Sequence, residues 1–274
     1  MSVYLEQRKV LANTDVRVSP LGLGTVKLGR DKGVKYPHSF RIPDDQQALA
    51  LLDQAWELGI NLLDTAPAYG NSEQRLGELL SVSPKDWMIA TKVGETFNPE
   101  NGESHYNFSP EFINTSIQQS LKNLRRDYLD IVLIHSDGND KQIIQHDGVL
   151  ETLAELKQQG LIRAIGMSTK TVEGGLLALE QSDVVMVMHN LHYQQEQAVL
   201  DQALMKNKGV FIKKALASGH LTSTDSSTDI VQANFDFIFS HPAVSSIIIG
   251  TINPTHLTDN VVKATKALSA NIIV

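Results

Sequence analysis

Residues 59–77 have the sequence GINLLDTAPAYGNSEQRLG, and this stretch decides the interpretation of the whole chain. An apolar run ends at Asp64, a turn carrying Tyr69 follows, and a helical pattern starts just beyond that turn. Strand, turn and helix in this order form the repeating unit of parallel α/β folds. The stretch therefore predicts that a carboxylate and a phenol point into the same space at the end of a buried strand.

Short apolar runs of this kind recur eight times along the chain. They are mostly apolar on both faces, as expected of parallel strands that are covered on both sides. The predicted strands are Leu21–Thr25, Asn61–Asp64, Trp87–Lys92, Asp130–His135, Arg163–Ser168, Val184–Met188, Val210–Lys213 and Ser246–Gly250.

Amphipathic stretches with helix-starting and helix-ending residues lie between these runs. The stretch 44–58 follows a proline and stops at a glycine, and 109–126 opens with Ser-Pro-Glu. The stretch 148–159 stops at a glycine, and 254–268 begins with a proline. Proline in the first turn and glycine just past the end are typical of helices, so all four stretches are predicted helices.

Eight strand–helix units with right-handed crossovers predict a (β/α)8 TIM barrel, here as a single domain over residues 1–274. Residues 3–18 are expected to form a β-hairpin that closes the barrel bottom, and residues 96–108 the longest loop on the opposite, functional face. The alternative is an open doubly wound sheet, which needs a G-x-G-x-x-G turn after the first strand. Residues 22–27 lack that pattern.

Composition excludes several classes of function. The net charge is −7 and no basic run is present, so we expect no nucleic-acid partner. The absence of cysteine excludes disulfides and thiolate chemistry, and no carboxylate cluster accompanies His189 and His192, so no metal site is predicted. Neither a signal-peptide pattern nor a run of about 20 apolar residues is present, which favours a cytoplasmic protein without membrane contact. The sequence carries no indication of oligomeric state.

Four polar residues fall at adjacent strand ends. Asp64 ends the second predicted strand, Lys92 the third and His135 the fourth, while Tyr69 follows the second. Taken singly, such an Asp often caps a helix and such a His is usually a hydrogen-bonded member of the core. Active sites of barrels lie at the carboxyl ends of the strands, so together these residues indicate one catalytic pocket.

This set of side chains suits carbonyl reduction. Hydride transfer to a carbonyl carbon leaves negative charge on the oxygen, which must be protonated, and a tyrosine with its usual pKa near 10 is a weak acid for that step. Lys92 is expected to lower the pKa of Tyr69, and Asp64 to hold the lysine charged. His135 can donate a hydrogen bond to the substrate oxygen. Tyr69 is therefore the predicted general acid.

Four segments in order, residues 18–25, 59–77, 90–94 and 128–135, resemble the aldo-keto reductases. The resemblance extends over nearly the whole chain, and it implies that Asp64, Tyr69, Lys92 and His135 match the catalytic tetrad of that family. It further implies NAD(P)H-dependent reduction of small-molecule aldehydes or ketones, or oxidation of the matching alcohols or sugars.

The resemblance also implies where a nicotinamide cofactor would bind. The corresponding residues are Gly24, Thr25, Asp64, Ser168, Lys213, Leu216, Ser218, Gly250, Thr251, Asn253, His256, Asp259 and Asn260. Thr169 and Met186 replace the asparagine and glutamine that bind the carboxamide in the family, and Lys213 replaces a tyrosine that stacks on the nicotinamide.

The choice between NADP and NAD depends on Gly250 and His256, which stand where the family has a lysine and an arginine for the 2′-phosphate. A 2′-phosphate is best held by fixed positive charge, and histidine is not a fixed cation at neutral pH. The family resemblance implies NADP, whereas these two substitutions leave NAD or dual use as the alternative.

Two other functions stay open. A Schiff-base lyase would use Lys92 as a nucleophile, although an adjacent Asp64 opposes that chemistry by keeping the lysine protonated. A non-catalytic nicotinamide-binding regulatory subunit would not need the complete tetrad. Within the reductase interpretation, Phe97, Tyr106 and Phe108 are the expected apolar contacts of the substrate.

Overall fold

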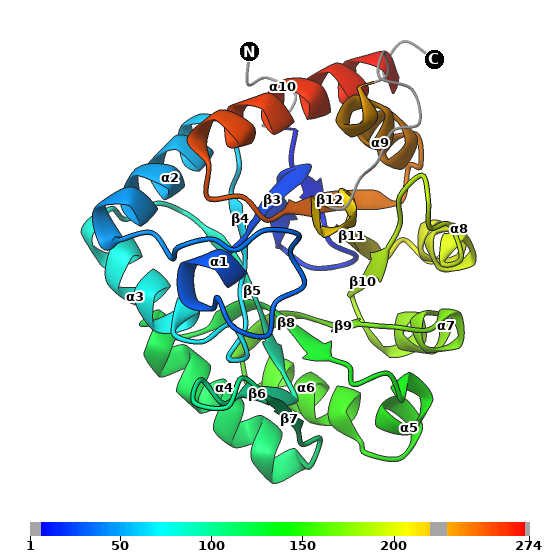
Figure 1. The fold of residues 1–274 in the computed structure, drawn as a ribbon. Coiled ribbons are helices and arrows are strands. Elements are labelled where there is room, and N and C mark those ends of the chain that lie inside the picture. Colours follow the sequence, from blue (N-terminus) through cyan, green and yellow to red (C-terminus); the bar gives the residue numbers. More distant parts are fainter. Residues whose placement is uncertain (1–6, 220–228, 272–274) are drawn as a thin grey trace.

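The computed structural model describes residues 7–219 and 229–271. Eight parallel strands form a closed barrel in the order β10-β11-β12-β3-β4-β5-β8-β9, with helices around it (Figure 1). The barrel strands are β3 (Leu21–Gly24), β4 (Leu62–Asp64), β5 (Met88–Val93), β8 (Leu129–His135), β9 (Ile162–Ser168), β10 (Val184–Met188), β11 (Gly209–Lys213) and β12 (Val244–Ile249). The predicted barrel and each of its eight strands are confirmed, with small differences at the strand ends.

The helices follow the punctuation in the sequence. They are α1 (Val26–Gly29), α2 (Asp45–Glu57), α3 (Ser72–Val82), α4 (Pro110–Leu124), α5 (Asp140–Gln145), α6 (Val149–Gln158), α7 (Val172–Gln181), α8 (Gln197–Met205), α9 (Ile230–Phe239) and α10 (Pro254–Asn271). Asp44 begins α2 with a capping box, because its side chain accepts from the Gln47 amide at 2.8 Å and the Gln47 side chain accepts from the Asp44 amide. Among the described helices, none has both the length and the apolar character needed to span a bilayer.

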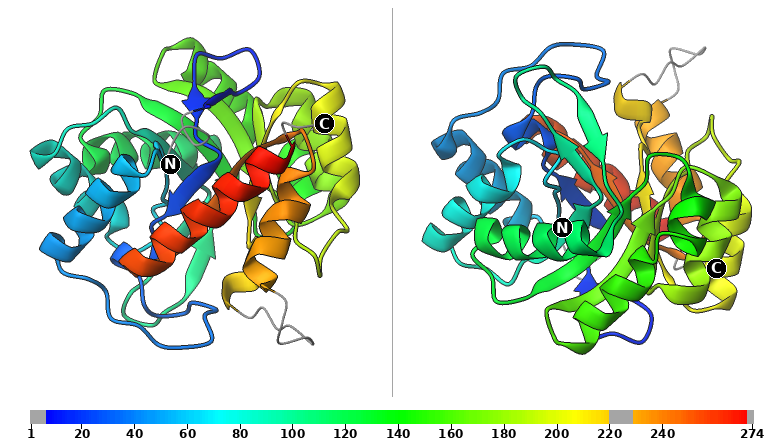
Figure 2. Two further views of the ribbon diagram at one scale, coloured as in Figure 1. Left: turned by 90° about the horizontal axis from the view of Figure 1, so that it is seen from above. Right: turned by 90° about the horizontal axis from the view of Figure 1, so that it is seen from below.

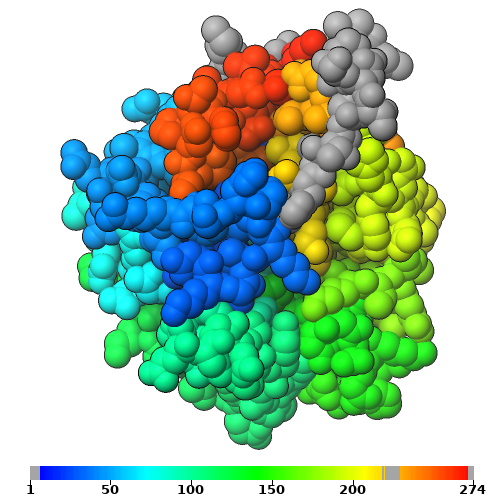
Figure 3. All heavy atoms as spheres, viewed as in Figure 1, coloured from blue at the N-terminus to red at the C-terminus, as the bar shows by residue number. Residues whose placement is uncertain are grey.

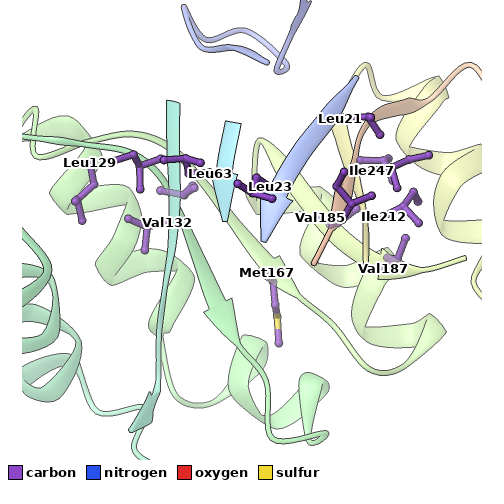
Figure 4. Packing of buried hydrophobic residues seen from close by; sticks show 14 of the residues in the cluster. Leu21, Leu23, Leu63, Leu129, Val132, Met167, Val185, Val187, Ile212 and Ile247 are labelled. Carbon is purple, nitrogen blue, oxygen red and sulfur yellow. The ribbon is translucent and has the colours of Figure 1, made fainter. Parts of the chain in front are cut away.

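The largest apolar cluster lies between the strands and the surrounding helices. Leu63, Val132, Val185 and Ile247 are among its buried strand residues, and their side chains are seen from close by in Figure 4. Burying strand residues on the outer face of the barrel against helices fixes which residues face inward, because side chains alternate along a strand. Polar side chains can therefore gather at the two ends of the barrel.

A two-stranded hairpin closes one end of the barrel. β1 (Lys9–Val10) pairs antiparallel with β2 (Arg17–Val18), and Leu11, Val16 and Val18 are fully buried against the barrel interior. Figure 2 shows this dark blue hairpin at the end of the barrel opposite to residues 30–44. The predicted hairpin is confirmed for residues 9–18, whereas residues 3–6 lie outside the described part of the chain.

Part of the predicted long loop at the functional face is a second hairpin. β6 (Glu95–Phe97) pairs antiparallel with β7 (Ser104–Tyr106), and the connection closes with a hydrogen bond from the Gly102 amide to the Asn98 carbonyl at 2.9 Å. The Asn, Gly and Ser residues that suggested a loop belong to the turn and the strand ends. The β-branched and aromatic residues between them form the short strands.

Residues 30–44, here called the crossing segment, contain no helix or strand and run across the open end of the barrel. Figure 3 shows the blue atoms of this part of the chain between the red and the green parts. The Lys32 ammonium donates to the Pro99 carbonyl at 3.2 Å, and Pro37 lies beside Gly219. At Gly33, where φ is +63°, an added Cβ would come within 2.9 Å of the Gly102 carbonyl, so the segment packs closely on the β6–β7 hairpin.

Candidate active site

Three strand ends and one turn bring the four predicted catalytic side chains together. Asp64 ends β4, Lys92 lies one residue before the end of β5 and His135 ends β8, while Tyr69 lies in the turn between β4 and α3. All four line one cavity of about 890 Å³ at the carboxyl end of the strands. This volume lies in the range of small-molecule and cofactor sites.

Lys92 and Asp64 form a buried ion pair at the floor of this cavity. The ammonium Nζ donates to Oδ1 of Asp64 at 2.6 Å and to the Thr65 carbonyl at 2.8 Å. The two side chains are 2% and 6% exposed, and their strands β4 and β5 are hydrogen-bonded neighbours. A lysine held in this way is fixed as a hydrogen-bond donor, which opposes the covalent attack that a Schiff-base lyase needs.

The turn after β4 holds Tyr69 above the ion pair. Its amide donates to the Ala66 carbonyl at 3.0 Å, which fixes the backbone. The centre of the phenol ring lies 4.6 Å from Nζ of Lys92. The ring also lies edge-on to the imidazole of His135, with 6.2 Å between the ring centres. Phenol, ammonium and imidazole therefore occupy one small volume.

The protonation of Tyr69 differs from the sequence-based expectation. Burial, together with the negative charges of Asp64 and Glu95, raises the pKa of Tyr69 well above 10. The expectation that Lys92 lowers this pKa is wrong in this structure. The charge of Lys92 is matched by Asp64 at 2.6 Å, and burial of the phenol is the largest cause of its raised pKa. The phenol keeps its proton at neutral pH.

Glu95, which the sequence analysis did not single out, contacts His135. Its Oε2 lies 2.7 Å from Nδ1 of the imidazole, and the residue is 8% exposed. Burial acts to raise the pKa of Glu95, but the contacts with His135 and Ser104 and the charge of Arg30 lower it to about 2. Burial, to which the charges of Lys92 and Lys213 add, lowers the pKa of His135 below 6.5 although Glu95 acts to raise it. Glu95 is therefore charged and His135 neutral at pH 7.

Most of the predicted cofactor residues line the same cavity as the tetrad. These are Gly24, Asp64, Ser168, Lys213, Leu216, Gly250, Thr251, His256, Asp259 and Asn260. The cavity thus runs from the catalytic side chains on β4, β5 and β8 to the start of α10. The space is continuous, as a long dinucleotide needs.

Two predicted cofactor residues do not line the cavity, and the side chain of a third is not among the described parts. Thr25 does not line the cavity, because its amide and its hydroxyl both donate to the Asp64 carbonyl at 2.9 Å. The Asn253 side chain, also away from the cavity, accepts from the Thr255 amide at 2.9 Å and so caps the start of α10. The Ser218 backbone lies in the short 3-10 helix Ala217–Gly219, and its side chain lies outside the described part.

A polar corner forms where the ends of β9, β10 and β11 meet. The Lys213 ammonium donates to Oγ of Ser168 at 2.9 Å and to the Thr169 carbonyl at 2.6 Å. Glu196 lines the cavity here, and its Oε1 accepts from the Met188 amide at 3.2 Å. Oε2 of Glu196 and Oγ1 of Thr169 are buried and have no hydrogen-bond partner among the described residues. Buried polar atoms normally have partners, so this corner suits a polar group of a ligand.

The crossing segment supplies cavity residues that no sequence motif indicated. Lys35 and Tyr36 line the cavity, and Nζ of Lys27 lies 4.2 Å from the centre of the Tyr36 ring. Tyr36 also lies opposite Gly250, where an added Cβ would be 3.5 Å from its hydroxyl. Only the path of the chain across the barrel end brings these residues to the site.

The expected apolar wall of Phe97, Tyr106 and Phe108 does not line the cavity. The guanidinium of Arg30 lies over the Phe97 ring at 3.7 Å from its centre, and Tyr106 stacks on Phe108 with 6.2 Å between ring centres. These rings stabilise the β6–β7 hairpin and its contact with the crossing segment. The three rings lie away from the cavity because the predicted loop is a hairpin in which Tyr106 packs on Phe108 and Phe97 packs against Arg30.

Comparison with known proteins agrees with this geometry. The model of the Aldo/keto reductase family matches residues 20–234. L-galactose dehydrogenase from Arabidopsis thaliana is 32% identical over 228 residues, covering 78% of this chain and 66% of that protein. NADH-specific methylglyoxal reductase from Escherichia coli is 29% identical over 234 residues, covering 78% and 68%. The matches span 55% to 66% of the length of the first three curated relatives.

Solved structures give the same result for the fold. A crystal structure from Pseudomonas aeruginosa assigned to the aldo-keto reductases superposes with a TM-score of 0.86 at 49% identity, covering 97% of this chain and 96% of that one. An aldo-keto reductase from Bacillus halodurans in its holo form has a TM-score of 0.77 at 22% identity, covering 96% and 95%. The latter shows the barrel fold alone.

Proposed function

Because the chain belongs to the aldo/keto reductase family, we propose that it reduces small-molecule aldehydes or ketones with a nicotinamide cofactor, using Tyr69 as general acid. The observation that carries the proposal is the fixed position of the Tyr69 ring above the buried Lys92–Asp64 pair in a ligand-sized cavity. The same groups serve oxidation of the corresponding alcohol or sugar, by microscopic reversibility. A single domain over residues 1–274 and a cytoplasmic location belong to the same proposal.

Side chains of the protein donate and accept the proton of the reaction. The cofactor supplies or accepts the hydride when it is bound. Tyr69 donates its phenolic proton to the oxygen on which negative charge develops. Lys92 lies close enough to the ring to stabilise the phenolate as it forms, and Asp64 and the Thr65 carbonyl keep its ammonium in place. His135 adjoins the phenol and contacts the substrate oxygen.

The polar corner fits the carboxamide of a nicotinamide ring. An amide offers two N–H donors and one carbonyl acceptor. Thr169 Oγ1, Ser168 Oγ and the Lys213 ammonium are the groups that would donate to the carbonyl, and Glu196 is the group that would accept from the amide nitrogen. The two partnerless atoms in this corner support that assignment. In this assignment Thr169 stands in for the family's asparagine, and Glu196 and Lys213 supply contacts that Met186 cannot make.

The adenosine end would lie near Gly250, His256, Asp259 and Asn260, at the start of α10. We propose NADP as the cofactor. NAD is the alternative, and the absence of a fixed cation at positions 250 and 256 favours it. A catalytic efficiency with NADH well above that with NADPH would overturn the NADP assignment.

A fluorescence titration with NADPH and NADH, followed by an aldehyde panel with the better cofactor, tests the proposal. We expect saturable binding, and turnover that Tyr69→Phe strongly lowers while binding persists. Binding without turnover of any carbonyl or alcohol would favour the regulatory subunit. A borohydride-trapped substrate adduct on Lys92 would favour the lyase.

A further inference from the structure

Lys27 is a partly buried cation of the cavity that has no carboxylate beside it. Lys27, Lys92 and Lys213 all line the cavity, and none of them is fully exposed. Lys92 donates to Asp64, and Lys213 donates to Ser168. Nζ of Lys27 donates no hydrogen bond and forms no ion pair with a described residue, and burial lowers its pKa from 10.5. A partly buried cation without a counter-ion suits an anionic ligand.

Two aromatic rings of the crossing segment hold this ammonium. Nζ of Lys27 lies 4.2 Å from the centre of the Tyr36 ring and 5.1 Å from that of Phe40. The two rings meet edge-on, with 5.6 Å between their centres. An aromatic face attracts a cation but carries no net charge. The rings therefore position the ammonium without neutralising it, and its N–H groups stay available to a ligand.

Close packing fixes the backbone of Lys27 beside the catalytic turn. Lys27 belongs to α1, at whose end the Arg30 amide donates to the Val26 carbonyl at 2.8 Å. At Gly29, an added Cβ would lie 2.4 Å from the Tyr69 carbonyl oxygen, so a glycine is needed for α1 to approach this turn. The start of the Lys27 side chain is therefore fixed relative to Tyr69.

The ring of Tyr36 lies beside the path from the tetrad to α10. Tyr36 lines the cavity, and its hydroxyl lies 3.5 Å from the position that a Cβ would take at Gly250. Gly250 directly follows β12 and precedes α10, where the adenosine end of the proposed cofactor would lie. A dinucleotide that reaches from Tyr69 to α10 carries its diphosphate along this part of the cavity. Positions 250 and 256 supply no fixed cation for it.

We propose that Lys27, held by Tyr36 and Phe40, is a phosphate-binding residue of the cavity, and that its ligand is a phosphate group of the dinucleotide. The ammonium donates a charge-assisted hydrogen bond to a phosphate oxygen. It thereby supplies the positive charge that positions 250 and 256 lack. The phosphate is either the diphosphate, which NADH and NADPH share, or the 2′-phosphate, which only NADPH carries. This inference rests on the proposed function, because that function brings a dinucleotide to the cavity.

Cofactor titrations of Lys27→Met and Lys27→Arg test the assignment. Methionine keeps an unbranched apolar side chain without the charge, and we expect the dissociation constant to rise about tenfold. An equal rise for NADH and NADPH identifies the diphosphate, whereas a rise for NADPH alone identifies the 2′-phosphate, and both results support the proposal. Lys27→Arg keeps a cation that can stack on the rings, so it should retain most of the affinity.

Lys32→Met is the matched control, because it removes the same charge from an exposed position of the crossing segment outside the cavity. This variant should bind both cofactors as the wild type does, and circular dichroism shows whether each variant is folded. Unchanged affinity in folded Lys27→Met would overturn the proposal. Equal losses in Lys27→Met and Lys27→Arg, or in Lys27→Met and Lys32→Met, would also overturn it, because the charge at position 27 would then not be the cause.

A second ligand separates this inference from the proposed function. If the wild type binds a dinucleotide and Lys27→Met binds it equally well, the inference fails while the proposed function stands. If the wild type binds neither dinucleotide, the proposed function fails, and isothermal titration calorimetry with inorganic pyrophosphate alone then tests Lys27. Weaker pyrophosphate binding in Lys27→Met than in Lys32→Met would support the phosphate site. Equal binding, or none, would overturn it.

Discussion

Nζ of Lys92 lies 4.6 Å from the centre of the Tyr69 ring while it donates hydrogen bonds to Asp64 and to the Thr65 carbonyl. The barrel thus fixes a cation beneath the phenol without making the resting phenol acidic. Its charge gains importance as negative charge appears on the ring during proton transfer. Preorganised charge of this kind stabilises the transition state more than the ground state.

Tyr69→Phe should lower turnover by about 10²- to 10⁴-fold, the usual contribution of a positioned general acid. The dissociation constant of the cofactor should change little, because the ring itself is kept. Steady-state kinetics with the best aldehyde, together with a cofactor titration, provide the measurement. Turnover close to that of the wild type would remove Tyr69 from the mechanism.

Asp64→Asn should destabilise the fold by about 3 to 5 kcal/mol, because it leaves the buried Lys92 ammonium without its carboxylate. Adding Lys92→Met should recover part of that loss while the enzyme stays inactive, because the unpaired charge is then gone. Urea unfolding of the single and double variants measures both effects. Additive losses in the double variant would mean that the two side chains do not act as a pair.

Glu95 should stabilise the fold in a pH-dependent way. Its pKa is lowered from 4.5 to about 2 in the folded chain. A carboxyl group of this kind stabilises the fold above its unfolded-state pKa, and the contribution is lost as pH falls from about 4.5 to about 2. It is on the order of 3 kcal/mol. The difference in unfolding free energy between wild type and Glu95→Gln should therefore be largest near neutral pH. It should shrink towards zero as the pH falls to about 2. A difference that does not vary with pH would contradict this account.

His256→Arg should strengthen NADPH binding by about tenfold and leave NADH binding unchanged, because it adds a fixed cation for a 2′-phosphate. His256 is exposed and lines the cavity, so the longer side chain fits. Thr255→Arg adds the same charge one residue earlier, at an exposed position outside the cavity, and is the matched control. Equal gains for both cofactors, or for both variants, would place the adenosine end elsewhere.

The sequence predicted those parts of the site in which a residue is placed by a local pattern, at the end of a strand or in the turn that follows it. Asp64, Lys92 and His135 follow from strand periodicity, and Tyr69 from the turn after β4. Glu95 carried only a weak signal, a carboxylate two residues beyond a buried strand in the turn made by Gly94, which has φ of +100°. That carboxylate could not be assigned to His135, because β6 and β8 are brought together only by the fold.

Sequence periodicity and helix punctuation by themselves predicted the barrel, its closing hairpin and the convergence of the tetrad, because each strand, helix and turn is a local pattern and the carboxyl ends of parallel barrel strands meet at one end. Tertiary structure alone decided the protonation of Tyr69, the contact of Glu95 with His135, the polar corner around Glu196 and the path of the crossing segment. Burial and charge pairing are sums over neighbours from distant parts of the chain. Only the folded arrangement of those neighbours decides whether burial or charge pairing has the larger effect on a given group.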